Sequence, residues 1–410
     1  MKVIQIKKAI SGMAYGMGML ACGSVLAGAT FKIDDTKWLS IGAGLRTSFA
    51  TVEGVAGRNG DKWSTDFGIN NIRLYVNGQL HEYIKVEFNT DCADCTDGGD
   101  MMILDAIAKF ETNDYANLWV GRQLVPSDRA ELDGPFYQNT FEFNKTPFYP
   151  SDFGSYDAGK FGRDDGINVW GALTADKKLT YVVGVFDGLD GRANADDNLL
   201  YAGRVSYNIL DVEKNPGYYT SSTYYGKGGD ILTVGVAGQY QEDGAGSTAT
   251  PASFFGTSVD VLFEKVLGNS GVITVEGEYK HFSVDGNDGN TAFDADCFCI
   301  FEGNAYTATA LYLLPQKVGI GQFQPYIRYT NNEPQNKGNI GFNGLGDPIT
   351  RRSPTREEFE AGINYIIDGH NASISLMYQY GDIATKGRNY RPDVTGDHVH
   401  AIKLGLQIQL

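Results

Sequence analysis

The sequence has 410 residues, of which 12% are aromatic and only 20% charged, against about 25% charged residues in typical soluble domains. A hydrophobic content of 42% is high enough to bury a core, which excludes a disordered chain. The formal net charge of −16 excludes nucleic acid as a natural partner, because phosphate backbones are bound through lysine and arginine.

The first 29 residues have the features of a secretory signal. Lys2, Lys7 and Lys8 precede an apolar run that ends in the small-residue cleavage site Val25-Leu26-Ala27-Gly28-Ala29. We expect residues 1–29 to be a signal peptide that is removed on export, and residues 30–410 to form one domain.

After this segment, apolar residues alternate with polar or small ones, which is the period of a half-buried strand. In the first such segment Leu39, Ile41 and Leu45 face one way, and Ser40 and Arg46 the other. Sixteen strands are predicted in this way, at 38–50, 72–80, 84–89, 101–111, 116–123, 166–174, 179–187, 199–209, 230–241, 256–266, 271–282, 303–314, 320–330, 356–367, 371–380 and 398–410.

The connections between these strands are alternately short and long. The long, polar set is 51–65, 91–100, 124–165, 188–198, 242–255, 283–302, 331–355 and 381–397. The other set consists of tight turns, with one long exception at 211–229. Short periplasmic turns alternating with long external loops are typical of an outer-membrane β-barrel. A barrel of this size has a lumen too wide for side chains to fill, so we expect the polar faces to point inward.

Several motifs along these strands resemble a known family. They include Asn71-Ile72-Arg73-Leu74-Tyr75-Val76-Asn77-Gly78-Gln79-Leu80, Leu118-Trp119-Val120-Gly121-Arg122-Gln123, Gly184-Val185-Phe186-Asp187-Gly188 and Phe323-Gln324-Pro325-Tyr326-Ile327-Arg328-Tyr329. Together they resemble the bacterial phosphate-selective porins O and P. The resemblance implies an all-β transmembrane antiparallel β-barrel of 16 strands, a homotrimer, with the third loop, 124–165, folded into the pore. Members that select phosphate line the pore with arginine and lysine, and no dense basic ladder is found here.

We therefore predict a porin of the bacterial outer membrane, a water-filled channel for passive diffusion of small hydrophilic solutes and ions. Its partners would be outer-membrane lipid and lipopolysaccharide. The alternative is a barrel that holds a partner such as a cytochrome in an electron-conduit complex. The third loop distinguishes the two, because a sheath for a partner would leave the lumen clear. Neither a Ser-His-Asp nor a Gly-x-Ser-x-Gly arrangement occurs, so we predict no enzymatic activity, and no cofactor or metal site is expected.

Strand parity predicts which charged side chains line the pore. The basic candidates are Arg46, Arg73, Lys85, Lys109, Arg204 and Arg328, and the acidic candidates are Glu87, Asp105, Glu111, Asp260, Glu264, Glu276, Glu278, Glu358 and Glu360. In the third loop the constriction candidates are Asp128, Arg129, Glu131, Asp133, Lys145 and Arg163. A mainly basic wall would face a mainly acidic one, and the loop carries an acidic excess. We expect a modest cation preference at low salt and no saturable phosphate site, because charge rings tune selectivity.

Four cysteines lie in two of the external loops. Cys92 and Cys95 form one pair and Cys297 and Cys299 the other, and disulfides within each loop suit an oxidising compartment. A zinc site made from both pairs would need two loops on roughly opposite sides of the mouth to meet.

Overall fold

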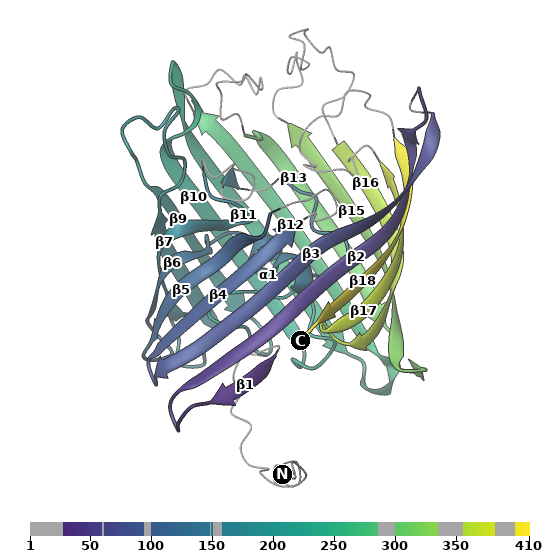
Figure 1. Cartoon of the computed structure of the whole chain (residues 1–410), viewed down its shortest axis with the longest axis horizontal. Coiled ribbons are helices and arrows are strands. Elements are labelled where there is room, and N and C mark those ends of the chain that lie inside the picture. Colours follow the sequence, from purple (N-terminus) through teal and green to yellow (C-terminus); the bar gives the residue numbers. More distant parts are fainter. Residues whose placement is uncertain are drawn as a thin grey trace, which may run out of the picture.

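Sixteen long strands close into one antiparallel barrel (Figure 1). The computed structural model describes residues 28–59, 61–93, 100–147, 149–150, 158–285, 300–334, 356–381 and 398–410. The barrel strands are β2 Trp38–Ala56, β3 Lys62–His81, β4 Ile84–Ala93, β5 Met102–Glu111, β6 Asn117–Leu124, β7 Arg163–Ala172, β8 Leu179–Phe186, β9 Leu200–Asn208, β10 Ile231–Ser247, β11 Thr250–Val266, β12 Val272–Asp285, β13 Gly303–Leu313, β15 Gly321–Pro334, β16 Arg356–Asp368, β17 Ala372–Gly381 and β18 Val399–Gln409.

Three smaller elements and a helix complete the described part. The strand β1 Ala29–Lys32 pairs with β2, and β14 Lys317–Val318 pairs with β15. One helix, α1 Arg129–Tyr137, lies in the connection from β6 to β7, and the 3₁₀ turn η2 Gly268–Ser270 joins β11 to β12. Within the described residues, no helix has the length and apolar character needed to cross a membrane.

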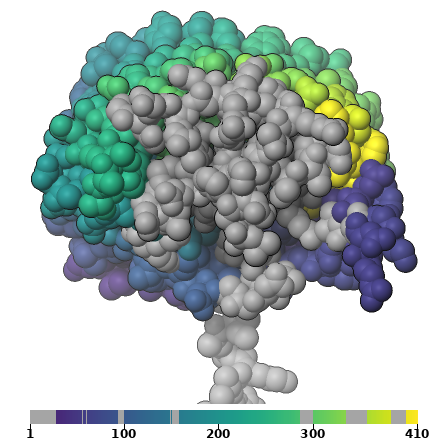
Figure 2. Space-filling view, turned by 90° about the horizontal axis from the view of Figure 1, so that it is seen from above, coloured from purple at the N-terminus to yellow at the C-terminus, as the bar shows by residue number. Residues whose placement is uncertain are grey.

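The ring closes between the two ends of the chain. Strand β18 pairs with β2 from Ala401 opposite Val52 to Gln409 opposite Gly44. Seen from above, the sequence colours run round the rim and bring the last strand beside the first (Figure 2). The prediction of a closed barrel of sixteen strands is confirmed.

The period-two pattern fixes which side chains point outward. On β2, Ile41 and Leu45 are exposed on the outer face, whereas Ser40 and Arg46 are buried. On β18, Ile402, Leu404 and Ile408 are exposed in the same way. An apolar outer face suits lipid, and a closed barrel satisfies every backbone group without an edge.

Two predicted external loops differ from the structure. Residues 242–255 were expected to be a loop, but β10 and β11 run on through them and are joined only by residues 248–249. Likewise β2 and β3 extend through most of 51–65. Gly, Ser, Thr and Ala make up much of these stretches, and the large apolar residues are confined to a few positions such as Trp63, Phe254 and Phe255, too few to reveal alternation along the whole stretch. Pairing with the neighbouring strand still supplies their hydrogen bonds.

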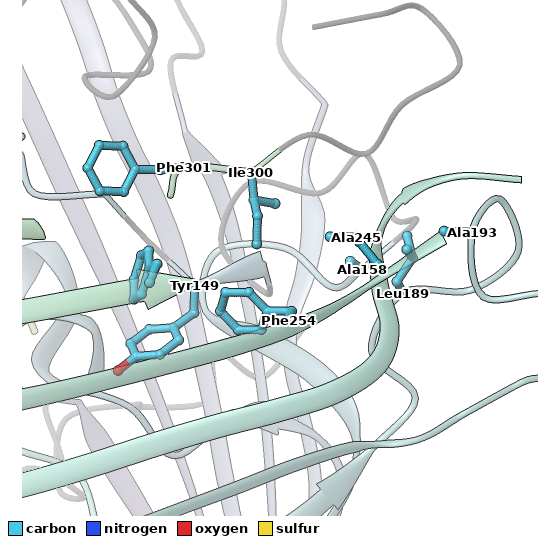
Figure 3. Packing of buried hydrophobic residues seen from close by; sticks show 10 residues of the cluster. Tyr149, Ala158, Leu189, Ala193, Ala245, Phe254, Ile300 and Phe301 are labelled. Atoms are coloured by element: carbon cyan, nitrogen blue, oxygen red, sulfur yellow. The ribbon is translucent and has the colours of Figure 1, made fainter. Parts of the chain in front are cut away.

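An apolar cluster packs at the external end of the barrel. Tyr149 meets Phe254 of β11 and Phe282 of β12, with ring centroids 6.5 and 4.9 Å apart. Leu189, Ile300 and Phe301 and several alanines join them (Figure 3). Parity predicts an inward position for Phe254, so this cluster anchors the external connections from within the ring.

Candidate functional site: the charged interior of the barrel

The strand residues predicted to line the pore all lie on the polar, buried face of the wall. Twelve of them are less than one-tenth exposed, namely Arg46, Arg73, Asp105, Lys109, Arg204, Asp260, Glu264, Glu276, Glu278, Arg328, Glu358 and Glu360. Lys85, Glu87 and Glu111 are partly exposed. Such low exposure means that other protein groups cover most of these charges.

On strands β3 to β7 the basic residues are paired with neighbouring carboxylates. Lys85 contacts Glu111 at 2.5 Å and Arg73 contacts Asp91 at 2.7 Å. Lys109 pairs with Glu87. The wall expected to be mainly basic is therefore compensated locally, because Asp91 continues the inward parity of β4 beyond the predicted strand end.

The constriction candidate Arg163 lies in the wall and not in the third loop. It is the first residue of β7, and it pairs with Asp105 of β5 at 3.1 Å. The predicted loop ended at residue 165, but residues 163–165 already pair with β6 and belong to the wall.

The opposite wall is compensated by cations from several elements. The two carboxylate oxygens of Asp260 in β11 accept hydrogen bonds from Nη1 and Nη2 of Arg204, at 2.5 and 2.7 Å. Glu360 pairs with Arg328 at 2.9 Å, and Glu358 with Lys145 at 2.5 Å. The constriction candidate Lys145 thus reaches from the β6–β7 connection to β16.

The N-terminus of α1 is fixed by charged groups. Asp128 caps the helix by accepting the backbone N–H of Glu131 at 3.1 Å, and its other oxygen pairs with Lys280 at 2.8 Å. The N–H of Arg129 donates to Asp260 at 3.2 Å. The helix is kinked at Gly134, which has a positive φ of 62° and precedes Pro135.

The C-terminal end of α1 and the residues after it contact strands on several sides of the ring. Asn144 donates to Glu278 of β12 at 3.1 Å, and Arg328 of β15 donates to the carbonyl of Glu142 at 2.9 Å. Asn364 of β16 and Gln407 of β18 donate at 2.9 Å to the carbonyls of Asn139 and Phe136 respectively. Arg46 of β2 donates to the carbonyl of Phe141.

Aromatic side chains of this connection also cover two predicted pore arginines. The Arg73 guanidinium carbon lies 4.9 Å from the centre of the Phe136 ring, and that of Arg46 lies 4.3 Å from the Phe141 ring. Cation–π contacts of this kind are favourable when they are shielded from water. Phe136 and Phe141 lie outside the alternating segments of the sequence, so periodicity does not predict this contact.

Burial and neighbouring charge shift the pKa of several groups in the connections. Burial raises the pKa of the Asp133 carboxyl, and the Glu276 carboxylate beside it raises it further. Burial acts in the same direction on Glu142, but Lys403 and Lys145 outweigh it and lower the pKa of Glu142 to about 2. The interior therefore shifts the pKa of its carboxyl groups in opposite directions, according to which charges lie beside them.

Glu213 is a member of the site that sequence reasoning did not identify. It lies in the connection from β9 to β10 and binds Arg129 through both carboxylate oxygens, at 2.6 and 2.9 Å. Burial acts to raise the pKa of Glu213, but the Arg129 guanidinium lowers it below its usual value. Glu213 lies outside the alternating segments, so strand parity could not predict that its side chain points into the barrel interior.

Cys92 of β4 is disulfide-bonded. Its predicted partner Cys95 lies outside the described residues, as do Cys297 and Cys299, so the pairing within each loop stays a prediction. Among the residues that the structure describes, His, Cys, Asp and Glu side chains form no group of three arranged to hold a metal ion.

Comparison with known proteins places this interior in a family. Residues 39–410 match the sequence profile described as phosphate-selective porin O and P, which covers almost the whole chain. The chain belongs to this family. It is an outer-membrane porin, and the resemblance noted in its motifs is confirmed. No curated protein sequence matches the chain.

Solved porin structures share the fold of this porin at low identity. OprB of Pseudomonas putida is 10% identical with a TM-score of 0.56, over 91% of this chain and 94% of that one. An anion-selective porin from Comamonas acidovorans is 13% identical with a TM-score of 0.54, over 91% and 100%. OmpT of Vibrio cholerae, in a trimer form, is 13% identical with a TM-score of 0.50, over 92% and 100%.

Proposed function

We propose that this porin admits small hydrophilic solutes and ions by passive diffusion, with a modest cation preference, and that the β6–β7 connection forms its constriction. The main support is the set of hydrogen bonds that this connection makes with the polar faces of β2, β12, β15, β16 and β18. A segment bonded to the inner face on so many sides narrows the lumen. It also disfavours the sheath for a cytochrome, which needs an open interior.

The pairing of most interior cations argues against a phosphate site in the described wall, whereas Arg46 donates to neutral oxygens of Asn71, Gln407 and Phe141. Arg73, Lys109 and Arg204 each contact a carboxylate, so a phosphate would have to displace an internal anion to bind them. Glu264, by contrast, accepts hydrogen bonds from neutral donors, including the Thr223 and Thr274 hydroxyls. Its charge, with the acidic excess of the constriction, favours cations.

Planar-bilayer recordings test this proposal. A potassium chloride gradient at low salt should give a reversal potential that indicates a small preference for potassium. Millimolar-range phosphate should leave the chloride conductance unchanged. A strong chloride preference, or block by phosphate, would show that anion selectivity has been retained, and absence of channel steps would exclude the channel function itself.

We also propose that residues 1–29 are removed on export and that three copies assemble in the outer membrane. The trimer form of the OmpT structure supports the assembly. The outer ends of the strands carry aromatic side chains suited to lipid and lipopolysaccharide, such as Tyr378 and Tyr380, which contact His400. Mass measurement of the mature chain and of the detergent-solubilised complex tests both points.

A further inference from the structure

The connection from β9 to β10 lies against α1 along its length. A long periplasmic turn was expected at 211–229, and the structure has a connection at 209–230. It leaves and rejoins the wall where the Asp211 N–H donates to the carbonyl of Asp230 at 3.0 Å. Between these points the Ser222 N–H donates to the carbonyl of Tyr137 at 3.1 Å, and the Thr220 hydroxyl donates to the carbonyl of Arg129 at 2.7 Å. The two connections therefore meet from opposite ends of the barrel.

Strand side chains hold this connection on both flanks. Glu264 of β11 accepts the backbone N–H groups of Tyr224 at 3.0 Å and Gly226 at 2.7 Å. On the other flank the Trp119 ring of β6 lies against Tyr218, with centroids 5.2 Å apart. A Cβ added at Gly217 would lie only 2.4 Å from the Trp119 ring, so the backbone approaches as closely as glycine allows.

Four charges balance at the meeting point. Arg129 of α1, Arg204 of β9, Asp260 of β11 and Glu213 of the β9–β10 connection form what we term the Arg129 cluster. Glu213 binds Arg129 at 2.6 Å, Arg204 binds Asp260 at 2.5 Å, and Arg129 Nε lies 3.5 Å from Asp260. Arg129 is 1% and Glu213 8% exposed, so solvent screens these charges little.

We propose that the β9–β10 connection is a second constriction element, and that Glu213 is a specificity-determining residue that cancels the charge of Arg129 for permeating cations. The proposal rests on the channel function proposed above. Without Glu213 the Arg129 cluster holds two cations and one anion. The uncompensated positive charge then repels potassium and attracts chloride at the junction of the two connections.

Reversal potentials of the Glu213→Gln variant at low salt test the charge role. We expect the potassium-to-chloride permeability ratio to fall about fivefold, because one unit charge about 8 Å from an ion in water disfavours potassium about twofold and favours chloride about twofold. The double variant Arg129→Gln/Glu213→Gln should restore the wild-type ratio, because it removes both members of the pair. Wild-type selectivity in Glu213→Gln would overturn the charge role.

Asp230→Asn is the matched control. Asp230 belongs to the same connection and pairs with Lys265, but its side chain is 34% exposed and that of Lys265 45% exposed. Removal of the Asp230 charge should leave the potassium-to-chloride permeability ratio unchanged. Heat-modifiable migration on gels confirms that each variant has a folded barrel. An equal shift in Asp230→Asn and Glu213→Gln would mean that the overall charge of the connection matters, and would overturn the assignment to Glu213.

Replacing residues 214–228 by a short glycine turn tests the constriction role. We expect the single-channel conductance to rise severalfold, because the β9–β10 connection is one of the two connections that the proposal places in the lumen. An unchanged conductance in a folded variant would place this connection outside the permeation path. These outcomes are separable from failure of the proposed function, which requires the wild-type protein itself to give no channel steps.

Discussion

Replacing Glu264 by Gln should loosen the β9–β10 connection while leaving the barrel intact. The Glu264 carboxylate is fully buried and accepts four hydrogen bonds. Oxygen Oε2 receives the Thr223 hydroxyl at 2.7 Å, the Tyr224 N–H at 3.0 Å and the Thr274 hydroxyl at 3.0 Å. Oxygen Oε1 receives the Gly226 N–H at 2.7 Å. Three of these four donors belong to the connection.

The magnitude follows from the loss of one acceptor and of the charge. The glutamine oxygen can replace Oε2 and accept the same three hydrogen bonds. The glutamine NH₂ group then replaces Oε1 and faces the Gly226 N–H, and because both groups are donors, this hydrogen bond is lost. A hydrogen bond to a charged group contributes about 1.5–3 kcal/mol, and the remaining three weaken when the charge is removed. The lower cost of burying a neutral amide offsets part of this loss. We expect the docked connection to lose about 2–3 kcal/mol.

Amide hydrogen exchange in detergent micelles measures this change directly. Opening of the connection governs exchange at Tyr224 and Gly226, so a loss of about 2–3 kcal/mol accelerates exchange about 30- to 150-fold. Thr274→Val is the matched control. It removes a hydroxyl of β12 that stays bonded to Glu264 when the connection opens, and it leaves all three donors of the connection in place, so we expect exchange at Tyr224 and Gly226 to change by less than about fivefold.

Unchanged protection of the Tyr224 and Gly226 amides in Glu264→Gln would refute this reasoning. The connection would then be held by its contacts with α1 and Trp119 alone. Equal acceleration throughout β10 and β11 would also contradict it, since the variant would then have destabilised the wall as a whole.

Three further predictions concern other parts of the chain. Burial lowers the pKa of His370, in the β16–β17 turn, to about 4. Because the unfolded chain takes up the proton first, the contribution of His370 to the free energy of unfolding should decrease by about 1.4 kcal/mol per pH unit as the pH falls from 6.5 towards 4. In urea unfolding, the slope of this free energy against pH should differ between wild type and His370→Gln by this amount, and equal slopes would exclude a contribution from His370. Phe254→Ala should lower the free energy of unfolding by about 3–5 kcal/mol, because the ring is fully buried in the external apolar cluster. The lipid-facing Phe255→Leu should have a much smaller effect, and similar losses would contradict the inward placement of Phe254. Mass spectrometry of unreduced peptides should show a Cys92–Cys95 link, and a link from Cys92 to any other cysteine would refute the pairing.

The wall of this porin is predictable from sequence because one physical rule governs all of it. Every barrel strand has one face in lipid and one face inward, so alternation identifies Arg204 and Asp260 as inward residues without knowledge of their partners. The rule weakens only where side chains are small. Residues 242–255 show this, since their strand character depends on pairing with a neighbour and not on an apolar face.

The filling of the barrel is not predictable in the same way. Glu213 and Phe136 lie in connections without a period, and their positions depend on contacts with strands far away in the sequence. The third-loop prediction placed Arg129 in a constriction, but it gave no indication that a carboxylate 84 residues later would neutralise this residue. A net charge calculated from the composition does not show which charged residues pair, whereas the fold brings Arg129 and Glu213 into contact.

The pairing of β18 with β2 closes the ring, and residues of these two strands also bind the β6–β7 connection inside it. Arg46 of β2 donates to Gln407 of β18, a residue 361 positions away, at 3.1 Å, and it also donates to the carbonyl of Phe141. Contacts of such sequence separation are slow to form, because most of the chain must first be in place. The last strand completes the wall and, through Gln407 and Lys403, also binds the β6–β7 connection. A barrel assembled from the other strands but lacking β18 would thus have an open edge and an unanchored interior segment. Strand β18 therefore has two roles in the fold: its pairing with β2 closes the ring, and Lys403 and Gln407 hold the β6–β7 connection against the inner face of the wall.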